Sequence, residues 1–203
     1  DESDSGRNRL GRGITMSDLD ILHQMIKDAV KVSLVGKYNK KQVTLTEPQQ
    51  PNSAVTIYGI PDNAIVIKAD AFKSPDTVFN CSKQGECKRA DFVIIAETGQ
   101  KKVIICIEMK TTKASKQEII QQLTGVQCVI TYCREIGKAF WNKPDFLNDY
   151  VYRFISIGHT SIPKNKTRID YPPGTHDRPD KMLKIDWPHR LQPKLSSHPV
   201  GAT

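Results

Sequence analysis

Two short runs with apolar residues on both alternating faces constrain this 203-residue chain most strongly. They cover residues 92–96 and 103–107, and the turn signal Thr98-Gly99-Gln100 lies between them. This spacing predicts a β-hairpin with strands over 91–97 and 102–111. Strands that are apolar on both faces are central strands, covered by other elements on each side. We therefore expect an α/β or α+β domain of three layers, with a mixed central sheet flanked by helices.

Other segments supply elements that pack on such a sheet. Apolar residues at three- and four-residue steps predict one helix over 17–35, ending near Gly36, and a second helix over 115–138. Ser17 followed by Asp20 resembles a capping box at the start of the first helix. Alternating or apolar runs predict further strands at 54–60, 64–69, 151–158 and 182–187.

The chain divides into three parts by composition. Residues 1–16 form a polar segment that we expect to be a flexible N-terminal arm. Residues 17–160 hold the predicted elements of one core domain, although the polar stretch 37–52 has no predicted element. Residues 161–203 are rich in proline and form a C-terminal extension that could serve as a partner-binding or dimerising arm.

The charge of the chain favours polyanionic partners. The formal net charge is +8 and the isoelectric point is about 9.2. Nucleic acid is the first candidate for such a partner, and an acidic membrane surface is the second. A basic chain that binds no polyanion remains the plain alternative.

The sequence contains no signal for export or membrane insertion. No apolar run approaches the roughly 20 residues that a membrane helix needs, and residues 1–13 lack the apolar core of a signal peptide. Three of the five cysteines lie in apolar segments, which is typical of buried free thiols in a reducing compartment. Cys81 and Cys87 flank a polar loop and could clip a metal ion, but no second Cys/His pair completes a zinc pattern. We expect an intracellular protein.

Charged residues end the most hydrophobic predicted strand. Glu108 and Lys110 are two residues apart, so their side chains share one face of that strand. Asp91 begins the partner strand, and antiparallel pairing about the turn brings it close to Glu108. Burying such charges costs free energy unless they pair or bind a ligand. The alternative is an ordinary ion pair at a strand end.

This group of residues suits phosphodiester hydrolysis. Two carboxylates can hold a hard cation such as Mg²⁺, for which Mn²⁺ could substitute, and the backbone carbonyl of Met109 could add an oxygen ligand. The cation neutralises charge on the scissile phosphate and activates water. A neighbouring lysine can orient or help to deprotonate that water and stabilise transition-state charge.

The motif resembles a known signature. Asp91, sixteen intervening residues and then Glu108-Met109-Lys110 are similar to the D…ExK pattern of the PD-(D/E)xK nuclease superfamily, and the resemblance covers about residues 17–160. It implies a restriction-endonuclease-like fold with an αβββαβ core. That core would comprise a helix at 17–35, strands at 64–69, 91–97 and 102–111, a helix at 115–138 and a strand at 151–158.

The resemblance also implies residue roles. Asp91 and Glu108 would be metal ligands, and Lys110 would position the attacking water. Many members carry a glutamine on the helix after the ExK strand, for which Gln121 and Gln122 are candidates. The apolar stripe places Gln122 on the sheet side, so we prefer it, although a helix-flank hydrogen bond would equally explain a glutamine there.

Other acidic residues fit the family pattern less well. Many members place a glutamate on the first helix, whereas this helix offers only aspartates. Asp62 and Asp76 each follow a proline and are read as turn residues. Asp70, at the end of an earlier strand, is a further candidate ligand. The aspartates of the first predicted helix are Asp18, Asp20 and Asp28.

Basic residues near the motif could contact phosphates. Lys88 and Arg89 precede Asp91, while Lys113 and Lys116 follow Lys110. A solvated loop is the alternative for the first pair. Thr111 or Ser115 could cap the following helix, whose N-terminus would also attract a phosphate.

Together these observations predict a Mg²⁺-dependent deoxyribonuclease, and the resemblance favours an endonuclease. A role in restriction or defence would fit the family, as would a homodimer, because double-strand cutters of this family often act in pairs. The alternative is a non-catalytic nucleic-acid-binding or assembly module on the same fold.

Overall fold

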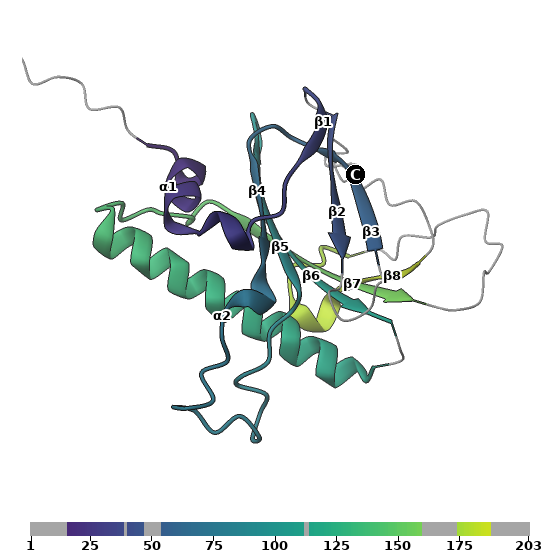
Figure 1. The fold of residues 1–203 in the computed structure, drawn as a ribbon. Coiled ribbons are helices and arrows are strands. Elements are labelled where there is room, and N and C mark those ends of the chain that lie inside the picture. Colours follow the sequence, from purple (N-terminus) through teal and green to yellow (C-terminus); the bar gives the residue numbers. More distant parts are fainter. Residues whose placement is uncertain (1–15, 39, 47–53, 112–113, 160–173, 188–203) are drawn as a thin grey trace, which may run out of the picture.

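The fold was analysed in a computed structural model that describes residues 16–38, 40–46, 54–111, 114–159 and 174–187. In this part of the chain, two β-sheets and two α-helices form three layers (Figure 1). The helices lie on one side of a five-stranded sheet, and a three-stranded sheet lies on the other. The domain is therefore a mixed α and β structure, as the sequence predicted.

The five-stranded sheet is the central layer. Its strands β4, β5 and β6 are antiparallel neighbours, whereas β6, β7 and β8 run parallel to one another. Thr98 pairs with Lys101, so a turn of two residues joins β5 to β6 and the predicted hairpin is confirmed. The strands are β4 (Ala64–Lys68), β5 (Phe92–Thr98), β6 (Lys101–Lys110), β7 (Val151–His159) and β8 (Leu183–Trp187), in that order across the sheet.

Helix α2 (Lys116–Phe140) covers one face of this sheet. Ser115 caps its N-terminus by accepting a hydrogen bond of 3.1 Å from the backbone N–H of Glu118. The predicted apolar stripe is buried against side chains of β5 and β6. The residues in this contact include Leu123, Val126 and Ile130 on α2 and Val93, Ile95, Ile104 and Cys106 on the sheet.

The other face is covered by strands, which corrects the expectation that helices flank the sheet on both sides. Strands β1 (Val35–Lys37), β2 (Lys40–Thr46) and β3 (Ala54–Ile60) form a second sheet. Its buried side chains, which come from β2 and β3, pack on Ile94, Ile105 and Ile107. Strand β2 falls in the polar stretch for which no element was predicted. Its alternation of Val43 and Leu45 with polar neighbours was the signal that could have revealed it.

Helix α1 (Asp18–Met25) is shorter than predicted, and the expected end near Gly36 is wrong. Its N-terminus carries the predicted capping box of Ser17 and Asp20. After Ile26 the chain is mostly extended, and Val32 donates a backbone hydrogen bond of 2.9 Å to Val66 in β4. Pairing with β4 thus replaces helix in this segment, which is rich in the β-branched valines that favour extended backbone.

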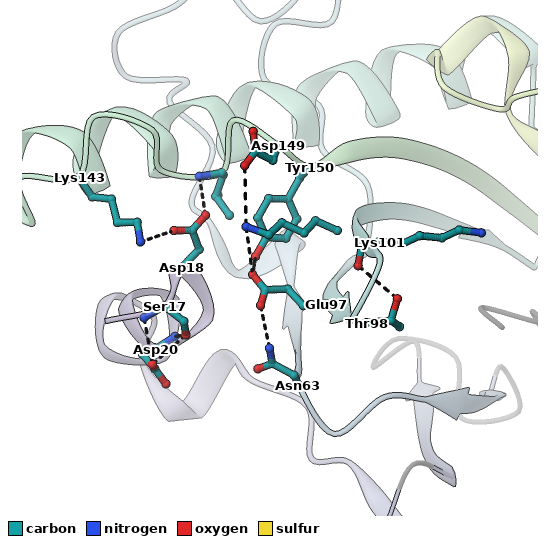
Figure 2. A network of polar contacts seen from close by, with 12 residues as sticks. Ser17, Asp18, Asp20, Asn63, Glu97, Thr98, Lys101, Lys143, Asp149 and Tyr150 are labelled. Carbon is teal, nitrogen blue, oxygen red and sulfur yellow. Dashed lines mark hydrogen bonds and ion pairs between the residues drawn. The ribbon is translucent and has the colours of Figure 1, made fainter. Parts of the chain in front are cut away.

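A polar network ties α1 and the β5–β6 hairpin to the segment between α2 and β7 (Figure 2). Glu97 accepts hydrogen bonds from the Tyr150 hydroxyl and from Asn63, the latter at 2.8 Å. Asp18 is only 6% exposed; it accepts a hydrogen bond of 3.0 Å from the backbone N–H of Leu147 and lies 3.1 Å from the Lys143 ammonium. Asp18 therefore links α1 to the segment between α2 and β7.

Substituting Asp18 with alanine is expected to lower the free energy of unfolding by about 3 kcal/mol, because it leaves a buried N–H donor without an acceptor and removes the acidic partner of Lys143. Urea denaturation measures the change. Asp149→Ala is the matched control, since its side chain is 77% exposed and lies 3.9 Å from Lys102. Equal stability of the two variants would contradict this role for Asp18.

The cysteines only partly follow the prediction of buried free thiols. Cys106 and Cys133 are buried, and burial raises the pKa of the Cys133 thiol to about 11. Cys128 is exposed because it lies on the solvent side of α2. Cys81 and Cys87 are paired as a disulfide, so they do not form the metal clip that was considered. None of the helices in the described ranges is long and apolar enough to span a membrane.

Candidate active site

The hairpin register brings Asp91 next to Glu108. Phe92 pairs with Ile107, so the preceding and following residues are the next neighbours across the two strands. The Asp91 Oδ2 atom accepts a hydrogen bond of 2.6 Å from the backbone N–H of Met109. Its backbone carbonyl accepts another, of 2.7 Å, from Ala69 at the end of β4. Asp91 is thus held in place from both neighbouring strands.

Glu108 and Lys110 form an ion pair at the end of β6. The Glu108 side chain is fully buried, and its Oε1 atom lies 2.8 Å from the Lys110 Nζ atom. Lys110 is 21% exposed and also lies 3.7 Å from Glu118 in the first turn of α2. The ammonium is therefore shared between carboxylates of the sheet and of the helix.

Several carboxylates act on the charge of Lys110. Burial of the ammonium works to lower its pKa, but the hydrogen bond and negative charge of Glu108, together with Glu118 and Asp91, outweigh burial and raise the pKa above its ordinary value. Lys110 is therefore a cation at neutral pH.

The site lies between the sheet and α2. Phe92, Ile107 and Met109 face the three-stranded sheet. Because side chains alternate along a strand, their neighbours Asp91, Glu108 and Lys110 lie on the other face, which α2 covers. Gln122 follows Glu118 by one helical turn, and its Oε1 atom is buried without a hydrogen-bond partner in the described part of the chain. A buried amide oxygen in this state is uncommon in proteins.

The structure adds Ser156 and Glu118 to the residues around the site. Ser156 is buried on β7 and pairs in register with Glu108, so it lies beside that carboxylate on the same face. The sequence indicated strand β7 but not its register with β6. That register depends on the path of the chain through α2, which local patterns do not determine.

The segment before Asp91 is docked onto α2. The Lys88 ammonium donates a hydrogen bond of 3.0 Å to the side-chain oxygen of Gln121, and the Lys88 carbonyl packs directly against Gly125. Arg89 donates hydrogen bonds to the backbone carbonyls of Phe72 and Cys87, at 2.5 and 3.4 Å. Gln121 therefore anchors this segment, which leaves Gln122 as the remaining glutamine candidate.

The remaining predicted residues lie in varied places. Lys113 falls outside the described residues, whereas Lys116 is exposed at the start of α2. Asp70 is exposed beside the site, in the short 3₁₀ turn after β4. The aspartates with partners elsewhere are Asp18 with Lys143, Asp20 with Ser17, Asp28 with Lys31 and Asp62 with Lys41.

The donor set suits Mg²⁺ better than a metal that needs a complete protein cage. Across the described ranges, no group of three or more His, Cys, Asp or Glu side chains is placed to hold a metal ion. Mg²⁺ is commonly held by one or two carboxylates together with water and substrate phosphate. Asp91 and Glu108 supply two such carboxylates, and the Met109 backbone lies between them in contact with Asp91. These residues could therefore hold that ion together with water and a substrate phosphate.

A pocket of about 250 Å³ lies on the opposite face of the sheet. It is lined mainly by apolar side chains of β5 to β8, with Lys101, Arg153 and His176 among its polar residues. Its lining includes none of the site residues predicted from the sequence, and it contains no Asp or Glu side chain. The carboxylate group beneath α2 is therefore the better candidate for hydrolytic chemistry.

Comparison with models of protein families, with curated proteins and with solved structures finds no match for this chain.

Proposed function

We propose that this protein is a metal-dependent nuclease that hydrolyses phosphodiester bonds of DNA, and that it has the αβββαβ core of the PD-(D/E)xK superfamily. The observation that carries the proposal is the convergence of Asp91, Glu108 and Lys110 on one face at the end of β6. The strand order supports it too, because an antiparallel β4–β5–β6 meander is followed by α2 and a parallel β7.

Each residue has a separate task in this proposal. Asp91 and Glu108 would hold Mg²⁺ or Mn²⁺, with the Met109 carbonyl as a further oxygen ligand. The cation would neutralise charge on the scissile phosphate and make water a better nucleophile. Lys110 would orient that water and stabilise the negative charge that develops on the phosphate. Gln122, whose buried amide oxygen has no partner in the described ranges, would help to place the water.

The surroundings supply phosphate contacts and shape. Lys116 stands exposed at the capped N-terminus of α2, where backbone N–H groups also favour an anion. Lys88 belongs to the segment before Asp91 and contacts α2 through Gln121. Arg89 hydrogen-bonds to backbone carbonyls and therefore helps to hold that segment in place. Lys88, Lys116 and the first turn of α2 would thus bind the phosphates that flank the scissile bond.

A cleavage assay tests the proposal. Supercoiled plasmid, linear duplex and single strands are incubated with Mg²⁺ or Mn²⁺, or with EDTA, and products are resolved on gels. Metal-dependent cutting is expected for the wild type, with a loss of at least about a thousandfold in rate for Asp91→Asn and Lys110→Met. Nicking of closed plasmid would identify an endonuclease.

Charge-matched substitutions away from the site are the controls. Asp149→Asn and Lys138→Met remove one charge each from exposed or half-exposed positions and should cut like the wild type. If folded wild type binds DNA but cuts none of these substrates with either metal, the enzyme assignment fails and the fold serves as a binding module. If the Asp91→Asn variant still cleaves DNA, the active site lies elsewhere in the protein.

A further inference from the structure

The three-stranded sheet has one face that faces away from the domain. Val43, Leu45, Val55 and Ile57 point inward and are buried in the core. The alternate residues of the same strands therefore point outward. They form the outward face of this sheet, which Figure 1 shows in the upper part of the molecule, away from α2. Its members include Val35, Lys37, Lys40, Gln42, Thr44, Thr56 and Tyr58.

Large side chains on and beside this face are exposed. Val35, Gln42 and Tyr58 are neighbours in register across β1, β2 and β3, so they form one row. Val35 is 61% exposed, Tyr58 is 37% exposed, and Tyr38 in the β1–β2 turn is 80% exposed. Strand β1 buries no side chain of its own, so packing against the domain does not explain these residues.

Two lysines on this face lie directly opposite each other. Lys37 pairs in register with Lys40 across the β1–β2 ladder, and like charges in that position destabilise a hairpin. Over the described residues, neither lysine has an acidic partner within 4 Å, whereas neighbouring Lys41 lies 3.1 Å from Asp62. An anion bound between Lys37 and Lys40 would relieve their repulsion.

We propose that the outward face of the β1–β2–β3 sheet binds single-stranded nucleic acid, with Tyr58 and Tyr38 stacking on bases and Lys37 and Lys40 contacting phosphates. Exposed rings beside unpaired cations are the combination that binds unstacked bases together with their backbone. A duplex keeps its base faces stacked and offers the tyrosines no such contact. The net charge of +8 favours the same partner. The proposal does not depend on the carboxylates beneath α2.

Fluorescence anisotropy with a labelled oligothymidylate of 20 nucleotides tests this binding, in EDTA so that cleavage plays no part. Lys37→Gln/Lys40→Gln should weaken binding by about tenfold or more. It should also reduce the slope of log affinity against log salt concentration by about 1.4, because two phosphate contacts of about 0.7 each are lost. Tyr58→Ala should weaken binding by about tenfold, the cost of one stacked base. Circular dichroism melts show whether the variants keep their fold.

Matched controls lie outside the three-stranded sheet. Lys27→Gln/Lys138→Gln removes the same charge, and Tyr132→Ala removes a tyrosine that is 65% exposed on α2. Both should bind like the wild type. Equal losses in control and test variants would overturn the proposal, as would a wild type that binds only duplex or no nucleic acid.

Lys37 in β1 and Lys40 in β2 could instead serve to keep sheet edges apart. In that case Lys37→Gln/Lys40→Gln would self-associate in size-exclusion chromatography with unchanged oligonucleotide affinity, and the proposal would be wrong. Failure of the cleavage assay would leave this result untouched, because binding is measured without metal.

Discussion

Gly125→Ala is expected to lower the free energy of unfolding by about 3 kcal/mol and to reduce cleavage more than the stability loss alone explains. A Cβ atom at Gly125 would overlap the Lys88 carbonyl oxygen and lie 2.8 Å from its carbonyl carbon. Both atoms belong to backbone, so the segment before Asp91 must move away from α2, at the cost typical of an overfilled contact. Asp91 lies three residues after Lys88 and would move with it.

Urea denaturation and plasmid cleavage measure the two effects. The control is Gly99→Ala in the β5–β6 turn, where an added Cβ meets no atom within 4 Å. Gly99→Ala should match the wild type in both assays. A Gly125→Ala protein with wild-type stability and activity would show that the Lys88 segment does not set the position of Asp91.

Lys110→Met is expected to destabilise the fold by about 3 kcal/mol, because it leaves the fully buried Glu108 without its ammonium partner. The double variant Glu108→Gln/Lys110→Met should recover most of this loss, since it removes the buried charge together with its partner. Denaturation of both single variants and the double variant at pH 7 gives the coupling between the two side chains.

The reference for this double-mutant cycle is a solvent-accessible ion pair on α2, in which the Lys138 Nζ atom lies 2.9 Å from the Glu135 Oε1 atom. The corresponding variants at that pair should show little coupling, because solvent screens exposed charges. Strictly additive effects of Glu108→Gln and Lys110→Met would indicate that the buried ion pair contributes nothing specific to stability. Because Lys110→Met is expected to be less stable, its cleavage rate is measured at a temperature below its unfolding transition.

The sequence predicted the closeness of Asp91 and Glu108 because this geometry is local. The two-residue turn at Gly99 and Gln100 fixes the register of the hairpin, and that register alone brings Asp91 to Glu108. The cap at Ser115 and the buried stripe of α2 are likewise local patterns. These features need no knowledge of the rest of the chain.

Features that depend on distant contacts were missed. The apolar residues after Ile26 fit a helical period, but backbone pairing with β4 makes that segment extended. The two-sided apolar strands indicated a covered sheet without revealing that one cover is itself a sheet. The Ser156 register and the contact between Lys88 and Gly125 join segments far apart in the sequence. Short-range periodicity contains no information about such contacts.

The tight β5–β6 turn also affects the order in which the chain assembles. Hairpin closure takes microseconds, whereas the parallel pairing of β7 with β6 must wait for the intervening chain through α2 to become ordered. A folding chain therefore holds Asp91 and Glu108 side by side before helix and sheet enclose them. During that interval the two carboxylates repel each other in water, so a divalent cation present while the protein folds would reduce this repulsion and favour closure of helix and sheet over them.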